Sequence, residues 1–266
     1  MPFYNNKSYD EVVDYREGMA GMAINEYRQA VETEVTSNEG ISNFFSPENL
    51  ERLKSIMYTK TAKADSFLFW EGDRSDYLYY VKKGLVKLTK TTDTGTKITL
   101  YLHHADDLFG QIDPFQASAH TFNAEVIEDA EFGIIQQKDL ETLLWQHGDL
   151  AIEFMKWMGM THRMTQTKFR DLMLYGKPGA LCSLLIRLSN SYGVPSGQQI
   201  TISKKINNTE MAEMIGATRE SVNRMLSDLR KQEAIAVDNG TVTIKNLNFL
   251  RDICKCESCP KEICRV

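Results

Sequence analysis

The sequence has little proline and glycine and no long apolar run. It holds 6 Pro and 16 Gly in 266 residues, which excludes collagen-like, low-complexity and wholly disordered chains. No apolar run reaches the roughly 18 residues that a membrane-spanning helix needs. The first residues, MPFYNNKSYDEVVDYREG, are too polar for a signal peptide. We therefore expect a soluble, cytoplasmic globular protein with no membrane partner, built as one large domain or two small ones.

An excess of positive charge is also missing. The chain has 31 Lys and Arg against 36 Asp and Glu, a net charge of −5, which argues against a non-specific nucleic-acid coat protein. The deficit is concentrated in residues 1–50, where nine acidic residues face three basic ones. The remainder is weakly basic, so the global charge does not exclude DNA binding. We interpret residues 1–45 as an acidic N-terminal extension, a partly ordered arm.

Short strand-like runs dominate residues 60–137. They are SFLFW, DYLYYV, GLVKLTKT, KITLYL, FNAEVI and EFGIIQ, with turn signals between them such as Lys82-Lys83-Gly84. Alternation of apolar and polar residues within these runs is typical of half-buried antiparallel strands. Closely spaced short strands of this kind predict a closed barrel or jelly roll.

Helical periodicity follows. Asp139 is suited to cap a short helix that ends near His147-Gly148, and a second helix is predicted from about Asp149 to about Asp171. Phe154, Trp157 and Met158 supply this helix with apolar area for the flanking barrel. A second stripe has the alternating spacing of a coiled-coil seam and consists of Ile152, Met155, Gly159, His162, Gln166 and Phe169. We interpret the seam as a homodimer interface, with simple core packing as the alternative.

A hinge-like break at Gly176-Lys177-Pro178-Gly179 precedes a second predicted domain. An amphipathic helix is expected over Ala180–Tyr192. Strands are expected over Gln199–Ile202 and, after a turn at Asn239-Gly240, over Val242–Ile244. Two helices lie between these strands, and this order is typical of a winged helix.

The two helices between the strands have the spacing of a helix-turn-helix. Thr209 is suited to cap the first helix, Gly216 permits the left-handed backbone of a tight turn, and Thr218 is suited to cap the second helix. The predicted buried residues are Met211, Ala212, Ile215, Val222, Met225, Leu226 and Leu229. In such a motif the N-terminal residues of the second helix face the major groove.

The start of this second helix carries side chains suited to reading DNA. Arg219 can bond a guanine edge through two hydrogen bonds, and Glu220 can accept one from a cytosine amino group. Contacts to bases or to the backbone are expected from Ser221, Asn223 and Arg224. Contacts to phosphates are expected from Lys204, Lys205 and Thr218. The alternative is a structural helical hairpin whose charges only face water, but the cap, the glycine turn, the Arg-Glu start and the wing together favour DNA binding.

Cysteine is absent from most of the chain and crowded at its end. Cys182 stands alone, whereas Cys254, Cys256, Cys259 and Cys264 lie within the last thirteen residues. Cys256-x2-Cys259-Pro260 has a spacing typical of iron–sulfur ligation. If Cys256, Cys259 and Cys264 supply three ligands of a cubane cluster, Cys254, Cys182, a carboxylate or a His could supply the fourth. The four clustered thiols would also suit tetrahedral zinc or a disulfide switch.

The order of barrel, long helix and winged helix resembles the cyclic-AMP receptor/fumarate–nitrate regulator family, over about Phe44 to Phe249. The run ATRESVNRMLSDLRKQ (Ala217–Gln232) is similar to the recognition helix of that family. The resemblance implies an α+β fold and a transcription regulator that binds palindromic double-stranded DNA as a homodimer, with RNA polymerase as a partner. The implied segments are the extension (1–45), a cyclic-nucleotide-binding-like barrel (46–147), the dimerisation helix (148–175), the winged helix (176–249) and a cysteine tail (250–266).

One stretch departs from the pattern of the nucleotide-binding members. Those members carry a Gly-Glu pair followed by an Arg, which together hold the cyclic phosphate. Here Gln111 follows Gly110, no Arg occurs before Glu125, and Asp113 would repel a phosphate. We therefore expect no cyclic nucleotide and look for the sensor elsewhere.

The tail and the end of the dimerisation helix are similar to the fumarate–nitrate regulators of Gram-positive bacilli. That branch holds a [4Fe–4S] cluster with three thiolates and one aspartate, which by match are Cys256, Cys259, Cys264 and Asp171 here. The resemblance implies an oxygen sensor that activates anaerobic metabolism and loses its cluster in air. Cys254 has no assured counterpart, and Cys182 is expected to be a buried apolar residue.

An iron–sulfur electron carrier or enzyme is the alternative from another class. The sequence shows no nucleophile–base set, no glycine-rich phosphate loop and no second cluster motif. Its five His residues lack metal-ligand spacing. We therefore expect no enzymatic activity.

Overall fold

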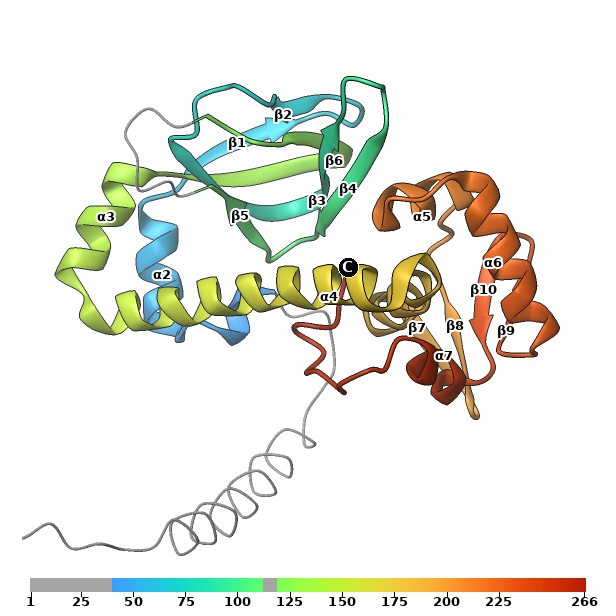
Figure 1. The fold of residues 1–266 in the computed structure, drawn as a ribbon. Helices are drawn as coiled ribbons and strands as arrows, with labels where there is room; N and C mark the ends of the chain where they lie inside the picture. The colour runs from blue at the N-terminus through green and yellow to red at the C-terminus, as the bar shows by residue number, and fades with distance from the viewer. Residues whose placement is uncertain (1–39, 112–118) are drawn as a thin grey trace, which may run out of the picture. The chain divides into compact units, whose positions relative to one another are not determined.

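The computed structural model describes residues 40–111 and 119–266 (Figure 1). The acidic extension, except for its last residues, and Asp113 lie outside this part. The described chain begins with the 3-10 helix η1 (Ile41–Asn43) and helix α2 (Pro47–Ser55). Ser46 caps α2 by accepting a hydrogen bond from the Asn49 amide at 3.4 Å.

Six strands form the first β domain. They are β1 (Tyr58–Ala62), β2 (Phe67–Phe69), β3 (Tyr77–Thr91), β4 (Lys97–His103), β5 (Leu108–Gly110) and β6 (Asn123–Gln136). The pairing order is β1-β6-β3-β4, while β2 pairs with β6 and β5 with β3, all antiparallel. Within the described residues β4 does not pair back to β1, so the sheet is a jelly roll and not the closed barrel of the first expectation. We call it the jelly roll.

The predicted turn at Lys82-Lys83-Gly84 is wrong. The runs on either side of it join into the single strand β3, and the last two runs likewise join into β6. The register between β3 and β6 shifts around Lys83 and Leu85, and Gly84 has φ of 97°. A Cβ at Gly84 would lie 2.7 Å from that of Ala130. The glycine therefore forms a bulge that bends the strand without ending it.

Helix α3 (Gln137–Gln146) follows the jelly roll, and Gln136, not Asp139, is its N-cap. Asp139 lies in the first turn, where its charge still favours the helix N-terminus. Helix α4 (Gly148–Tyr192) is interrupted at Gly176, whose φ of 61° and ψ of −166° are not helical. Pro178 begins the second half, because proline is tolerated in the first turn of a helix. The predicted break is therefore present.

The first half of α4 has one buried face and one exposed face. Phe154 and Trp157 are buried in the core that it shares with α2, α3 and the jelly roll, as expected. Met158 is 46% exposed, so the expectation that it packs on the jelly roll is wrong. Lys168 donates to the Leu100 carbonyl of β4 at 2.9 Å, which fixes the helix to the sheet.

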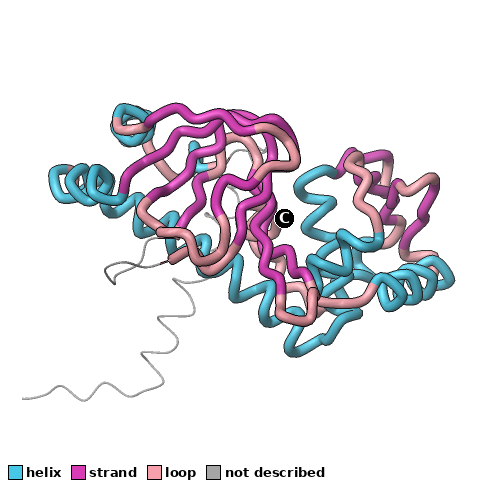
Figure 2. Tube along the Cα trace, turned by 90° about the horizontal axis from the view of Figure 1, so that it is seen from above, coloured by secondary structure: helices cyan, strands magenta, loops and turns pink. Residues whose placement is uncertain are grey.

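The second domain has the winged-helix order. Its elements are β7 (Gly193–Ser196), β8 (Gln199–Ile202), α5 (Asn208–Ile215), α6 (Arg219–Lys231), β9 (Ile235–Asp238), β10 (Thr241–Ile244) and α7 (Leu247–Ile253). The sheet order is β7-β8-β10-β9. Figure 2 shows the strands of the jelly roll and those of the wing as two separate groups with helices between them. Of these elements, β7, β9 and α7 were not predicted.

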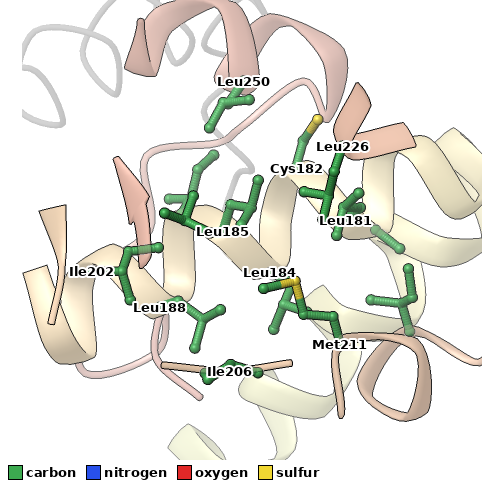
Figure 3. Packing of buried hydrophobic residues seen from close by; sticks show 14 of the residues in the cluster. Leu181, Cys182, Leu184, Leu185, Leu188, Ile202, Ile206, Met211, Leu226 and Leu250 are labelled. Atoms are coloured by element: carbon green, nitrogen blue, oxygen red, sulfur yellow. The ribbon is translucent and has the colours of Figure 1, made fainter. Parts of the chain in front are cut away.

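The core of the second domain surrounds the second half of α4. Leu181, Leu185 and Leu188 are fully buried there, and Leu226 of α6 and Leu250 of α7 pack around them (Figure 3). Leu85 and Leu102 of the jelly roll belong to the same cluster. The winged helix therefore packs directly against the jelly roll in this structure. After α7 the chain continues as residues 254–266, which we call the cysteine tail.

Candidate functional site

The helix-turn-helix is stabilised by local hydrogen bonds. Asn207, not the predicted Thr209, caps α5. Its side chain accepts hydrogen bonds from the Thr209 and Glu210 amides at 2.9 Å, and its own amide donates to the Glu210 carboxylate. This reciprocal arrangement is a capping box. Gly216 adopts the left-handed conformation, with φ of 61°. Both Gly216 and the α6 cap Thr218, which accepts from the Ser221 amide at 3.2 Å, match the sequence prediction.

The predicted DNA-reading side chains lie on one exposed end of α6. Arg219, Glu220, Asn223 and Arg224 are exposed, and Ser221 is half-buried. The opposite face of α6 buries Val222, Leu226 and Leu229, while Met225 is only half-buried. The start of α6 is therefore free to enter a groove, as the motif requires.

The two predicted phosphate lysines differ in surroundings. Lys205 is exposed. The Nζ of Lys204 lies 3.6 Å from Glu128 of the jelly roll and 5.4 Å from the ring centre of Tyr192. In this arrangement Lys204 joins the two domains, so only Lys205 faces solvent for a phosphate.

The predicted dimer seam is a continuous exposed stripe. All six of its residues are exposed: Ile152, Met155, Gly159, His162, Gln166 and Phe169. Ile152 is 52%, Met155 62% and Phe169 65% exposed. Met173, also 64% exposed, extends the stripe by one further turn and was not predicted. The apolar members of this stripe lie exposed on a helix that is buried on its other face.

Asp171 lies where the two halves of α4 meet. It is 2% exposed and lies before the break at Gly176. One oxygen, Oδ1, accepts from the Arg170 guanidinium at 2.6 and 3.1 Å. The other, Oδ2, accepts from Ser183 and, at 3.3 Å, from Arg187, both beyond the break. A carboxylate has about four lone-pair positions, so this buried charge is fully hydrogen-bonded.

The cysteine tail runs back across Asp171. Glu257 forms an ion pair with Arg170, and Arg187 donates to the Ile263 carbonyl at 3.0 Å. Burial raises the pKa of Cys264, Arg187 lowers it, and Cys256, Cys259 and Asp171 raise it further. Arg170 and Arg187 therefore connect Asp171 to the cysteine tail.

The other two cysteines differ from these three. Cys254 is 2% exposed and donates its thiol to the Leu250 carbonyl at 3.3 Å. Burial, together with the neighbouring Cys256 and Asp171, raises the pKa of Cys254 to about 11. Cys182 is 1% exposed in the apolar core, as predicted, and burial raises its pKa to about 12. Both side chains favour the protonated thiol over the thiolate that binds metal.

The described side chains do not form a preassembled site for a single metal ion. In the part of the chain that the structure describes, no three His, Cys, Asp or Glu side chains converge to hold one metal ion, as tetrahedral zinc requires. A cubane cluster instead spreads its ligands over four irons. Three thiolates and a carboxylate would bring four negative charges, which Arg170 and Arg187 partly compensate. Iron ligation by Asp171 would replace one of its present hydrogen bonds.

Sequence reasoning missed the arginine that joins these groups. Arg187 is 5% exposed and bonds Thr167, Asp171, Ser183 and the tail carbonyl of Ile263. A lone charge in the otherwise apolar run LCSLLIRLS was the available signal. A charge buried in such a run must have partners, because an unpaired buried charge is costly.

A cavity of about 260 Å³ lies between the jelly roll and α4. Gln111, which stands where a nucleotide-binding acid was sought, accepts from Thr121 at 3.2 Å. The only arginine on the described lining is Arg265, from the cysteine tail, and it is paired with Asp107.

No helix in the described residues is long and apolar enough to cross a membrane.

Comparison with known proteins gives consistent matches along the chain. Residues 59–147 match the cyclic nucleotide-binding domain family, and residues 179–253 match the Crp-like helix-turn-helix domain family. The chain is 40% identical over 227 residues to the anaerobic regulatory protein of Bacillus subtilis, an alignment that spans 85% of this chain and 95% of that protein. It is 30% identical over 183 residues to the global nitrogen regulator of a Synechocystis species, spanning 67% and 80% of the two chains.

The solved structures extend this likeness to the fold. A CooA mutant from Carboxydothermus hydrogenoformans superposes with a TM-score of 0.67 at 18% identity, over 83% of this chain and 98% of that one. At this identity the likeness concerns the fold alone. It agrees with the order of jelly roll, long helix and winged helix described above.

Proposed function

Because the chain belongs to the cyclic-AMP receptor/fumarate–nitrate family of transcription regulators, we propose that it senses oxygen through a [4Fe–4S] cluster and activates genes of anaerobic metabolism. The family consists of regulators, not enzymes. The observation that carries the proposal is the attachment of the cysteine tail beside Asp171 at the break in α4, through the Arg170–Glu257 ion pair and the hydrogen bond from Arg187 to the Ile263 carbonyl. A regulator that acts on DNA would work in the cytoplasm.

The proposed ligands are Cys256, Cys259, Cys264 and Asp171. When bound, the cluster would supply an oxygen-sensitive link between the tail and the helix. The carboxylate is a harder, less well matched donor to cluster iron than a thiolate. The Asp171 corner is therefore proposed as the labile one.

The residues around Asp171 would couple this link to the winged helix. Ser183 and Arg187 attach Asp171 to the half of α4 that belongs to the second domain. Arg187 also attaches that half to the tail. A change at Asp171 would therefore alter hydrogen bonds on both sides of Gly176, where the backbone can turn. A ligand shifts such an equilibrium only by binding one arrangement more tightly than the other.

The DNA-bound form is proposed to be a homodimer through the α4 seam. Two α6 helices related by two-fold symmetry would lie about 34 Å apart, one turn of DNA, on a palindromic site. Arg219 and Glu220 would read bases, with Ser221, Asn223 and Arg224 beside them, and the Thr218 hydroxyl would lie near a phosphate. RNA polymerase is the proposed partner at the promoter.

No cyclic nucleotide is proposed as the effector, although residues 59–147 match a nucleotide-binding family. A cyclic phosphate needs an unpaired cation. The Arg265 guanidinium in the cavity is already paired with Asp107 at 2.5 Å. Titration with cyclic AMP is expected to leave DNA affinity unchanged.

The central experiment is purification without air, followed by an absorption spectrum and iron and sulfide assays. Wild type should be brown, contain iron and sulfide in equal amounts, and bleach in air. Asp171→Ala should hold less cluster or lose it faster, and Asp171→Cys should retain it longer in air. An exposed aspartate on the same protein, changed as Asp228→Ala, is the matched control.

The alternatives give different results in the same samples. A colourless protein with zinc, or with a disulfide in the tail, would overturn the cluster proposal. Equal rates of bleaching for wild type and Asp171→Cys would leave the cluster but refute the labile role of Asp171. Binding of operator DNA with equal affinity by holo and cluster-free protein would refute the switch.

A further inference from the structure

The two residues after Cys264 lie between the two domains: Arg265 pairs with Asp107 of the jelly roll, and Val266 packs in the core of the second domain. The Arg265 guanidinium lies 2.5 Å from Oδ1 of Asp107, in the turn between β4 and β5. Asp107 is 1% exposed, and its other oxygen accepts from the His104 amide at 2.8 Å. A tail side chain thus provides the guanidinium that pairs with a carboxylate buried in another domain.

Val266 follows Arg265 into the same region. It is 6% exposed, and its amide donates to the Ser191 hydroxyl at 3.3 Å. Arg265 and Val266 line the 260 Å³ cavity opposite His120 of the jelly roll and Trp157 of α4. Figure 1 shows this end of the chain beside α4, between the jelly roll and the winged helix.

The charges around Asp107 explain why Arg265 is needed. The Nδ1 atoms of His103 and His104 are 3.9 and 4.0 Å from the carboxylate, too far for hydrogen bonds. Burial lowers the pKa of His103 to about 4 and also lowers that of His104, so both rings are neutral near pH 7. Among the described residues, Arg265 is the only permanently charged cation paired with Asp107, so its loss would leave this buried carboxylate without one, a costly arrangement.

We propose that Arg265 and Val266 act as a built-in ligand of the jelly-roll cavity, tying the cysteine tail to the jelly roll. The cavity would then be closed by the protein's own chain where a separate effector would otherwise enter. Arg265 and Asp107 supply the ionic contact, and Val266 supplies apolar contact. These contacts of Arg265 and Val266 form with or without a cofactor.

A second consequence rests on the proposed function. Cys264 directly precedes Arg265, and its carbonyl accepts from the Asn190 amide group at 2.6 Å. The hydrogen bond from Asn190 and the attachment of Arg265 to Asp107 therefore both restrain the backbone at Cys264, a proposed cluster ligand. Arg265 would be a positioning residue for Cys264 and not a ligand itself.

The test uses Trp157 as a probe of the cavity in cluster-free protein. Trp157 is 7% exposed, whereas the other two tryptophans, Trp70 and Trp145, are 53% and 91% exposed and can be changed to Phe. In this background, Arg265→Gln, Asp107→Asn and a chain cut after Cys264 should each raise the acrylamide quenching constant of Trp157 severalfold. Arg251→Gln, an exposed arginine on α7, is the control and should leave it unchanged.

Two further readouts keep the test decisive. The double variant Arg265→Gln/Asp107→Asn should quench no more than the stronger single variant, because both remove one contact. Circular dichroism identifies any variant that unfolds, and Arg265→Gln leaves the jelly-roll sequence intact. Quenching that is unchanged in both Arg265→Gln and the cut chain would overturn the proposal.

The cluster arm is separate. If wild type binds iron and sulfide without air, Arg265→Gln should lose them faster on exposure to air, and an unchanged rate would refute the positioning role. If no variant binds them, the proposed function fails while the quenching result still decides whether Arg265 and Val266 close the cavity.

Discussion

The guanidinium of Arg187 lies 3.3 Å from the carboxylate of Asp171, and the two residues stand on opposite sides of the break at Gly176. Both are almost fully buried, with 5% and 2% exposure. A buried ion pair across a break in a helix couples the two halves: removing Asp171 leaves the buried Arg187 without a carboxylate, whereas removing Arg187 leaves Asp171 paired with Arg170 alone. The same arginine also holds the Ile263 carbonyl of the cysteine tail. Arg187 therefore contacts both halves of α4 and the cysteine tail at the same time.

Arg187→Met should strongly destabilise the cluster-free protein. The change leaves Asp171 with Arg170 and Ser183, and removes the hydrogen bonds of Arg187 to Thr167 and to the Ile263 carbonyl. A hydrogen bond to a charged group contributes about 1.5–3 kcal/mol. Urea unfolding measures this loss. The double variant Arg187→Met/Asp171→Asn should recover part of it, since the buried carboxylate that has lost one of its two cations is then neutral. A loss no larger than that of Arg251→Met, at an exposed position, would contradict this account.

Thiol alkylation should divide the cysteines into two classes. Cys256 and Cys259 are half-buried and should react with iodoacetamide first, whereas Cys182 and Cys254 are buried. Burial raises the pKa of Cys182 to about 12 and that of Cys254 to about 11. Below these values the thiol is the dominant form, so at pH 8 only about a thousandth of Cys254 is thiolate. Its reaction should accelerate as the pH rises towards 11.

Mass spectrometry of digested protein follows each cysteine in this experiment. Protein prepared without air should show Cys256 and Cys259 protected and reactive again after exposure to air. Reaction of Cys254 at pH 8 as fast as that of Cys256 would contradict the assigned burial.

Arg219→Ala should reduce affinity for the specific DNA site. A bidentate contact to a base contributes about 1–3 kcal/mol, a change of about fivefold to 150-fold in Kd. The site can be obtained by selection from random DNA with the wild-type protein, and binding is measured by fluorescence anisotropy. Arg230→Ala, at the other end of α6, is the control and should have little effect.

Lys205→Gln should act differently from Arg219→Ala. A phosphate contact carries no sequence information, so its loss should weaken specific and non-specific binding alike and reduce the salt dependence by about one ion. Equal losses of specific and non-specific affinity for Arg219→Ala would show that Arg219 also contacts only phosphate.

Met155→Glu should prevent dimerisation. Met155 is 62% exposed near the N-terminal end of the seam, and a charge there would be buried against the second copy in the proposed dimer. Sedimentation velocity should show a monomer for this variant and a dimer for wild type. Lys156→Glu, on an adjacent exposed face of the same helix, should remain dimeric. A dimeric Met155→Glu would exclude the seam as the interface.

The predictions made from local patterns had mixed outcomes. The helix caps predicted at Asp139 and Thr209 are Gln136 and Asn207 instead. Gly216 and Thr218 behave as predicted because a tight turn and a helix cap depend on neighbouring residues. The turn predicted at Gly84 failed, because a glycine permits a positive φ in a bulge as readily as in a turn. Only the facing strand, with Ala130 close against Gly84, decides between them.

The candidate site also combines features that local sequence patterns predict with contacts that only the tertiary structure shows. The exposed face of α6 and the α4 seam follow from periodicity within one helix. The ligand set of Asp171 and the tail cysteines was implied only by resemblance and stays a prediction, and neither Arg187 nor the Arg265–Asp107 pair was predicted. Their partners are far apart in sequence, 76 residues for Arg187 and Ile263 and 158 for Arg265 and Asp107. Spacing along the chain carries no information about such contacts.

The sequence by itself determined the order of jelly roll, long helix and winged helix, the start of the recognition helix and the position of the break in α4. These depend on caps, glycines and apolar periodicity, which act over a few residues. The tertiary structure decided that the tail folds back over Asp171 and ends against Asp107. That outcome depends on α7 and the tail packing onto the second half of α4, where buried charges must find partners from distant parts of the chain.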